Sequence, residues 1–421
     1  MASYPLVSPA ASLATATGLQ IKAWDRILQM RALPEDIFFR LGGNYQTAVK
    51  AVPNGIYMKV PATANQSYSV TFPLLMPLSG DPGMGTGTDP LTNAEQQTMR
   101  QIVAYYNDYD KTVLATGYGI EYIQGQPYGL LEKVTPLIAT FLKELYGYWM
   151  RYALINGVSP NLQSSPVSAS VVPHPNTLIK GISLAMQPSE RYTNNSNLMA
   201  SIIASEMLNV PATTAGALDA ATILDLASYV TYNKPMLPLN IGGESVYILT
   251  VPTSQKNYLL NPANSDGLGA VWQATSRFAN KEIADLPQVL GQIANVVLVE
   301  DPRAPVAKAY GSGSGSFAAS ATNAVYADFY LKPGLNDART TVTSDVLEAC
   351  FLLGQGAVAD LEPEVAHYET ETQYLGKTVI KGAFGSRGFN RMDYDKSTAT
   401  TTSKVNQSSA VLWCRKQTAS F

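Results

Sequence analysis

The segment from residue 235 to residue 252, PMLPLNIGGESVYILTVP, constrains the fold more tightly than any other. Its prolines hold the approach extended, because each proline fixes its own φ and disfavours the helical region for the residue before it. Gly242 and Gly243 then favour a tight turn, and residues 246–251 form a β-branched and aromatic run of strand length that Pro252 closes. The segment predicts a β-hairpin in a buried sheet and contains no catalytic motif.

The composition suits a chain that is covered by other chains. With 421 residues it exceeds the usual size of one hydrophobic core, so two or three domains are expected. Charged residues make up 14%, and there are 24 tyrosines against 11 phenylalanines. A typical soluble domain has about 25% charged residues, whereas interface cores are poor in charge and rich in tyrosine. An ordinary low-charge secreted or bacterial protein would have the same composition.

The charge pattern shows no surface for reading nucleic acid. The net charge is −3, so no global positive field attracts DNA, and Arg387/Arg391 and Arg415/Lys416 are predicted to be solvated or interface charges. Cys350 and Cys414 lack CxxC spacing and are predicted to be buried, reduced thiols. Residues 1–18 have neither a basic start nor a continuous apolar core, and no stretch approaches ~20 apolar residues, so neither a secretory leader nor a membrane span is expected.

The strongest helical signal lies between residues 130 and 155, where apolar pairs recur every four residues while Lys143, Glu144 and Arg151 mark the opposite side. Such a helix would be roughly 35–40 Å long. A capping box of Thr92 and Glu95 predicts another helix through Val113. Further helices are predicted at 18–33, 198–208, 220–231 and 344–360, strands at 178–184, 296–300, 325–331, 377–384 and 410–415, and loops at 79–90, 311–322 and 397–409.

Two short strands, residues 55–60 and 68–75, are predicted to form a two-stranded ribbon around the polar turn 62–66. The ribbon has little apolar surface of its own. Because an isolated two-stranded ribbon is marginal in water, this one should lie on another surface.

The ordered set of segments resembles the major capsid proteins of tailed bacteriophages with the Hong Kong 97 fold. Within them it is most similar to the coat-protein family typified by coliphage N-four. The similar segments are spread over residues 40–395: 68–78 with Gly80-Asp81, 92–97, Pro173-His174-Pro175-Asn176, 236–255, 295–302, 350–359 with its Gly-Gln-Gly-Ala, and 374–390.

The resemblance implies an α+β fold in which each region has a role. Residues 1–47 would be an N-terminal arm and helix, and residues 48–90 an extended β loop lying across a neighbouring subunit. Residues 91–164 would form a peripheral domain with the long spine helix, residues 165–350 an axial domain, and residues 351–421 the return to the peripheral domain and the C-terminal strands. Candidate assembly residues on these elements are Tyr57, Lys59, Tyr68, Phe72, Trp149, Gly242, Gly243 and Tyr247.

The function implied is a coat protein that self-assembles into hexamers and pentamers of an icosahedral head. The head would enclose double-stranded DNA without sequence readout, and portal, scaffold and decoration proteins are further partners of such a shell. The resemblance places the protein in the virion, assembled in the cytoplasm of a bacterial host. The fold's founding member joins a loop lysine to a neighbour's asparagine; Lys59 occupies a comparable place, where an ordinary interface lysine is the simpler interpretation.

No residue pattern indicates catalysis, a cofactor or a metal. Gly376-Lys377-Thr378 is not a P-loop, because position 371 is glutamate where that motif needs glycine. The two histidines, His174 and His367, belong to no zinc motif, and Glu362, Glu364, Glu369 and Glu371 lack a calcium-loop glycine. The alternatives left open are a nanocompartment shell, a tail structural protein and an enzyme with an unrecognised site.

Overall fold

The computed structural model describes most of the chain from residue 99 onward and parts of the segment before it. The described residues are 38, 56–60, 68–75, 99–116, 130–172, 174–179, 216–233, 236–241, 243–261, 288–308, 346–373, 378–398 and 401–415. The predicted arm, the helices at 18–33 and 198–208, the strand at 325–331, the loops at 79–90 and 311–322, and Gly242 lie outside these residues.

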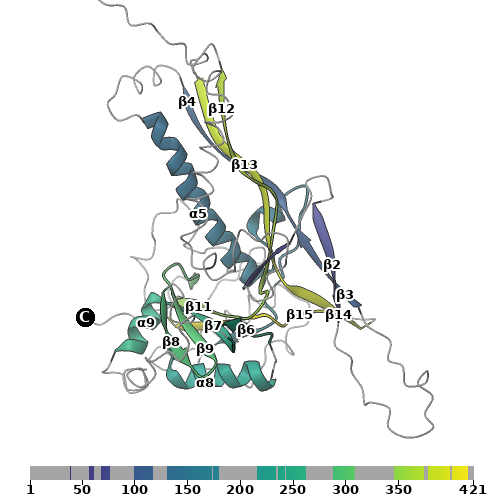
Figure 1. The fold of residues 1–421 in the computed structure, drawn as a ribbon, viewed down its shortest axis with the longest axis vertical. Coiled ribbons are helices and arrows are strands. Elements are labelled where there is room, and N and C mark those ends of the chain that lie inside the picture. Colours follow the sequence, from purple (N-terminus) through teal and green to yellow (C-terminus); the bar gives the residue numbers. More distant parts are fainter. Residues whose placement is uncertain are drawn as a thin grey trace, which may run out of the picture.

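A long helix packs against a long, four-stranded sheet (Figure 1). The helix, α5, spans Leu130–Asn156 and confirms the predicted spine helix. The strand order is β1-β12-β13-β4; β1 runs parallel to β12, and the other neighbours are antiparallel. Their bounds are β1 Tyr57–Val60, β12 Val358–Gln373, β13 Thr378–Arg391 and β4 Asn107–Thr116.

A second sheet lies across the C-terminal end of α5, with the shorter helices on its far side (Figure 1). Its order is β5-β16-β11-β7-β9-β8, with β6 paired to β7 and β10 to β11. The strands are β5 Thr177–Ile179, β6 Leu239–Ile241, β7 Glu244–Pro252, β8 Val289–Ile293, β9 Val296–Asp301, β10 Val306–Lys308, β11 Val346–Leu353 and β16 Ser409–Arg415. The helices are α8 Ala220–Ser228, which continues as the π-helix η3 Tyr229–Asn233, and α9 Thr253–Leu260.

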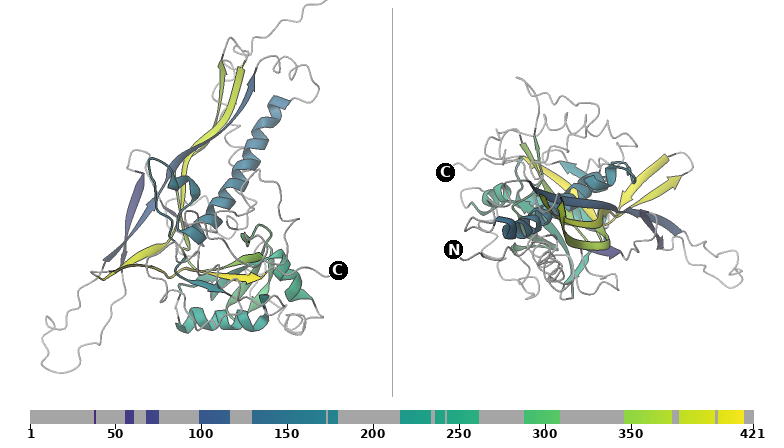
Figure 2. Two further views of the ribbon diagram at one scale, coloured as in Figure 1. Left: turned by 180° about the vertical axis from the view of Figure 1, so that it is seen from behind. Right: turned by 90° about the horizontal axis from the view of Figure 1, so that it is seen from above.

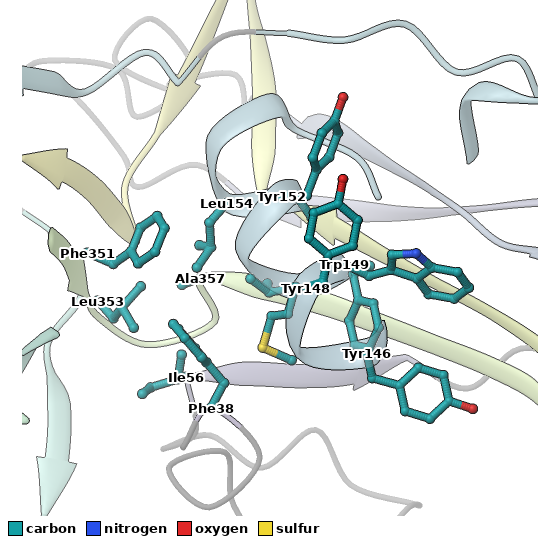
Figure 3. Packing of buried hydrophobic residues seen from close by; sticks show 14 of the residues in the cluster. Phe38, Ile56, Tyr146, Tyr148, Trp149, Tyr152, Leu154, Phe351, Leu353 and Ala357 are labelled. Carbon is teal, nitrogen blue, oxygen red and sulfur yellow. The ribbon is translucent and has the colours of Figure 1, made fainter. Parts of the chain in front are cut away.

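The second sheet is buried on both faces. Along β11, Phe351 and Leu353 join the core shared with α5, while Cys350 and Leu352 join a separate core beneath α8. The first of these cores includes Trp149 and is closed by Phe38, whose ring meets that of Phe351 edge-on at 6.0 Å (Figure 3). Burial on both faces makes the sheet the layer that joins the two cores.

The hairpin at 235–252 is confirmed. β6 and β7 pair antiparallel, and Gly243 in the turn between them has φ +87°, a left-handed conformation that glycine adopts without steric cost. The predicted helix at 220–231 and the strands at 296–300, 377–384 and 410–415 are confirmed as well. Cys350 and Cys414 are buried and free, as expected.

Two predicted helices are wrong. Residues 99–105 form β3 (Met99–Tyr105), and residues 107–113 belong to β4. Ile102, Ala104 and Tyr106 are buried, while Val103 is exposed. This alternation is the period of a strand. Residues 346–353 form β11, since an apolar run that is buried on both faces of a sheet has no alternation to distinguish it from a buried helix.

The predicted ribbon is paired differently from the expectation. Residues 57–60 and 69–75 are strands, but β1 pairs with β12, and β2 (Ser69–Leu75) pairs with β3. The predicted loop at 397–409 also contains strand, because β14 (Asp393–Thr398) and β15 (Thr401–Asn406) form an antiparallel hairpin. For β1 and β2, pairing is decided by partners distant in sequence, which local pattern does not specify. The strands β14 and β15, in contrast, are neighbours in sequence, and their Ser/Thr-rich composition was taken for a loop.

The β2–β3 and β14–β15 ribbons form two arms that project from the same side of the molecule (Figure 2). β3 and β14 lie in contact. Within the part of the chain that the structure describes, each ribbon has two strands and no third. No helix among the described residues has the length and apolar character needed to cross a membrane.

The buried Tyr229 in the core beneath α8 should make the stability of the fold fall at high pH. Tyr229 is 2% exposed, and burial raises its pKa to about 12. An exposed tyrosine ionises near pH 10. The unfolded chain therefore loses this proton first, and the stability present below pH 10 falls by about 1.4 kcal/mol per pH unit between pH 10 and 12. We expect Tyr229→Phe to remove this part of the decline, measured as urea unfolding free energies at pH 8, 10 and 11. Equal slopes in both proteins would contradict the prediction.

Candidate functional site

Buried arginines join the C-terminal half of α5 to both sheets. Arg387, on β13, has a fully buried side chain and forms two hydrogen bonds with Asp360 on β12: Nε to Oδ1 at 2.9 Å and Nη2 to Oδ2 at 2.6 Å. Its Nη1 lies 3.4 Å from Oε1 of Glu362. The guanidinium also lies 4.5 Å from the ring centre of Tyr146 on α5 and 4.8 Å from that of Phe389. One cation thus ties two strands to the helix.

The hydroxyl groups of Tyr146 and Tyr109 are hydrogen-bonded to each other beside this cation. Burial raises the pKa of Tyr146 to about 12, and it also raises the pKa of Tyr109 well above its ordinary value. Both phenols therefore stay neutral in any physiological medium. They link β4 to α5 and are not poised for proton transfer.

Arg151 connects α5 to the second sheet. Its Nε and Nη2 donate to the two carboxylate oxygens of Asp301, at the end of β9, at 2.9 and 2.7 Å. Both side chains are buried, and the Phe38 ring lies 4.7 Å from the guanidinium. The sequence placed Arg151 on the polar side of the helix with Lys143 and Glu144; the structure buries Arg151 and leaves the other two partly exposed.

Arg391 closes the end of α5. Its Nη1 donates to the carbonyl oxygens of Leu154 and Ile155 at 3.0 and 2.9 Å, and its Nη2 donates to that of Val172. Its Nε donates to Asp393 at the start of β14. The last carbonyls of a helix lack partners within the helix and attract cations, so this is a favourable place for an arginine.

A hydrogen-bond network fixes the base of the β14–β15 arm. Asn406, fully buried, donates to Asp393 and accepts from the backbone N–H groups of Ser408 and Ser409. His174 Nδ1 accepts from the N–H of Asn176, so its Nε2 carries the proton and donates to Ser409 Oγ at 2.9 Å. The Pro-His-Pro-Asn segment noted in the sequence is thus a structural contact.

These groups hold the fold together, and each arginine has a carboxylate partner. Among the described residues, no three histidine, cysteine or carboxylate side chains are placed to bind a metal. His367 sits on the exposed face of β12, with Nδ1 3.4 Å from Glu364 and Nε2 3.3 Å from Glu369. The arrangement accounts for a rigid subunit.

The expectation that Arg387 and Arg391 are solvated or interface charges is wrong. Alternation along β13 carries the missing signal: Arg387, Phe389 and Arg391 share one face with Ala383, which is fully buried. Residues of one face share one environment, so a buried alanine and phenylalanine indicate buried arginines. The prediction for Arg387 and Arg391 considered only their charge and not their position along the strand.

The predicted assembly residues lie in several separate places. Tyr57 and Lys59 are on β1, where Lys59 is in register with Asp360. Tyr68, 40% exposed, stands at the root of the β2–β3 arm, and Phe72 lies within that arm.

Two of the other predicted assembly residues, Trp149 and Tyr247, are internal. Trp149 is buried in the α5 core, with its ring 5.4 Å from that of Tyr109. Tyr247 is buried and donates its hydroxyl hydrogen to the Met236 carbonyl oxygen at 2.9 Å. Gly243 lies in the exposed hairpin turn. An effect of Trp149 or Tyr247 on assembly would therefore act through the shape of the subunit.

No protein-family model matches this sequence, and no curated protein matches it. The fold does match solved structures. A spine helix against a long sheet, a second sheet between two cores, and projecting two-stranded arms together make the fold of phage capsid proteins, which confirms the predicted fold class.

Three structures show this likeness over nearly the whole chain. The capsid of Ralstonia phage GP4 has a TM-score of 0.55 and 12% identity, covering 92% of this chain and 94% of that chain. The capsid asymmetric unit of cyanophage Pam1 has a TM-score of 0.56 and 13% identity, covering 87% and 90%. The head structure of Helicobacter pylori bacteriophage KHP40 has a TM-score of 0.55 and 14% identity, covering 91% of each chain.

Proposed function

We propose that this chain is the major capsid protein of a tailed bacteriophage. The observation that carries the proposal is the match to phage capsid subunits over about nine tenths of both chains, so that no large part of this molecule is left for another task. These matches favour a phage head over a nanocompartment or a tail tube.

The mechanism is geometric. Copies of the chain form hexamers and pentamers, and closed symmetry turns modest contacts between neighbours into a stable shell. The buried arginine contacts support this role, because they make one rigid body of α5 and both sheets. The arms support it as well: a two-stranded ribbon is marginal alone, and the surface of a neighbouring copy would stabilise it.

The contents of the shell follow from charge and volume. A net charge of −3 gives no attraction for a polyanion, so double-stranded DNA would be held by confinement without sequence readout. Portal, scaffold and decoration proteins would be the further partners, and assembly would take place in the cytoplasm of the bacterial host.

Expression of the full chain in bacteria tests the proposal. We expect closed, shell-shaped particles in negative-stain electron micrographs of the purified protein, made of local five- and six-fold clusters. Helical tubes would favour a tail protein, and particles that package a cargo protein would favour a nanocompartment. Purified protein that stays monomeric, both alone and with the other head proteins of its phage, would overturn the proposal.

The same particles test covalent joining through Lys59. We expect a denaturing gel to show a single band near 45 kDa, the mass of one chain being 45.2 kDa. A ladder of multiples would instead show that subunits are linked by a bond such as the lysine–asparagine amide.

A further inference from the structure

An asparagine side chain bonds the root of the β2–β3 arm to the body. Asn390, on β13, is 2% exposed. Its Oδ1 accepts a hydrogen bond from the Tyr105 N–H at 3.0 Å, and its Nδ2 donates to the Tyr105 carbonyl oxygen at 2.7 Å. Tyr105 is the last residue of β3, so the side chain bonds both backbone groups of the residue where the arm begins.

A side chain is needed here because the edge of β13 is already occupied. β4 pairs with β13 as far as Arg387 and Asn107. Beyond that point the chain segment after α5 takes the edge: Val158 bridges to Asn390, and the Ser159 N–H donates to the Phe389 carbonyl oxygen at 2.9 Å. The arm therefore meets the face of β13, where a strand has no backbone groups free to bind it.

The contact is also close. A Cβ atom at Gly388 would lie 2.1 Å from the Tyr105 carbonyl oxygen and 2.8 Å from the Tyr106 Cα. Around it, Ala104 and Tyr106 pack against Ala359 and Leu361 of β12. The Tyr106 N–H donates to the Tyr68 carbonyl oxygen at 3.0 Å, which joins the two strands of the arm at its root.

We propose that Asn390 is the residue that positions the arm: its paired hydrogen bonds to Tyr105, over Gly388, fix the direction in which β2–β3 leaves the body. Only a primary amide both donates and accepts in this way. Aspartate would accept from the N–H but would place a negative oxygen against the carbonyl. A second copy of this chain is the partner that the arm meets, and this part of the inference rests on the proposed function.

Spin labels can measure the direction of the arm without any assembly. Thr71 on β2 and Thr140 on α5 are both exposed, and Cys350 and Cys414 are buried, so Thr71→Cys and Thr140→Cys would take the labels. Labelled chains diluted into unlabelled ones report the distance within one subunit. We expect one narrow distance distribution in the parent protein.

In Asn390→Ala and Asn390→Asp we expect the population of displaced arms to rise on the order of tenfold, since an unpaired buried group shifts an equilibrium by about that factor. Asn240→Ala is the matched control, because Asn240 is an exposed asparagine on β6. A narrow, unshifted distribution in both Asn390 variants would overturn the positioning role, whether or not the protein forms shells.

Assembly is a separate readout. If the parent protein forms closed shells, the Asn390 variants should give fewer or misshapen ones while Asn240→Ala assembles normally. Displaced arms with normal shells would overturn the link to the partner copy and leave the proposed function intact. If the parent protein never forms shells but the direction of its arm still depends on Asn390, the proposed capsid function would be overturned, and the positioning role of Asn390 would stand.

Discussion

Asp360→Ala should destabilise the subunit by about 3–5 kcal/mol, because removing one partner of a buried ion pair leaves the other charge buried without compensation. Arg387 would stay buried beside the rings of Tyr146 and Phe389 after the carboxylate is lost. Glu362, at 3.4 Å, would remain as its nearest carboxylate and would offset only part of the loss. Urea unfolding of the purified subunit measures the change.

Two further variants separate the ion pair from mere side-chain loss. Glu369→Ala removes an exposed carboxylate near His367 and should change the unfolding free energy by less than about 1 kcal/mol. The double variant Asp360→Leu with Arg387→Met should lose less than Asp360→Ala alone, since it leaves no buried charge unpaired. An Asp360→Ala protein as stable as the parent would show that the pair does not hold β12, β13 and α5 together.

Phe351→Ala should cost about 3–5 kcal/mol of unfolding free energy, the usual range for removing a fully buried phenylalanine and leaving a cavity. Phe351 is 0% exposed, in the middle strand of the second sheet, and faces both Phe38 and α5 (Figure 3). The cavity would open between the sheet and the helix, where Arg151 and Asp301 keep the two at a fixed spacing. Thermal and urea unfolding both measure the loss.

Leu137→Ala is the control for this substitution. Leu137 lies on α5 as well but is 66% exposed, so its truncation should change stability by no more than about 0.5 kcal/mol. If both variants lose the same amount, the second sheet does not pack on α5 as described.

The sequence predicted the elements whose information is local. The apolar period of α5 and the Gly-Gly turn before β7 each lie within one stretch of chain, and both are confirmed. The capsid fold followed from the order of such elements, since none of them is specific alone.

Interactions between distant residues were not predictable in this way. β11 was taken for a helix because both of its faces are buried, and residues 349–353 are all apolar, so they show no alternation that would indicate a strand. The partner of β2 is β3, which follows it only after a long connection in the sequence. Asn390 and Tyr105 are 285 positions apart, and nothing near either of them in the sequence indicates that they meet.

The position of β16 affects when a subunit becomes complete. β16 lies inside the second sheet, between β5 and β11, and Asn176 bonds to Ser409 across 233 positions of chain. During synthesis both neighbouring strands exist before β16 emerges from the ribosome, so neither core can close until then. Such late pairing is slow. If the chain forms the proposed shell, this order has a benefit: an unfinished chain would lack the shape that neighbouring copies recognise, and incomplete subunits would be kept out of the growing shell.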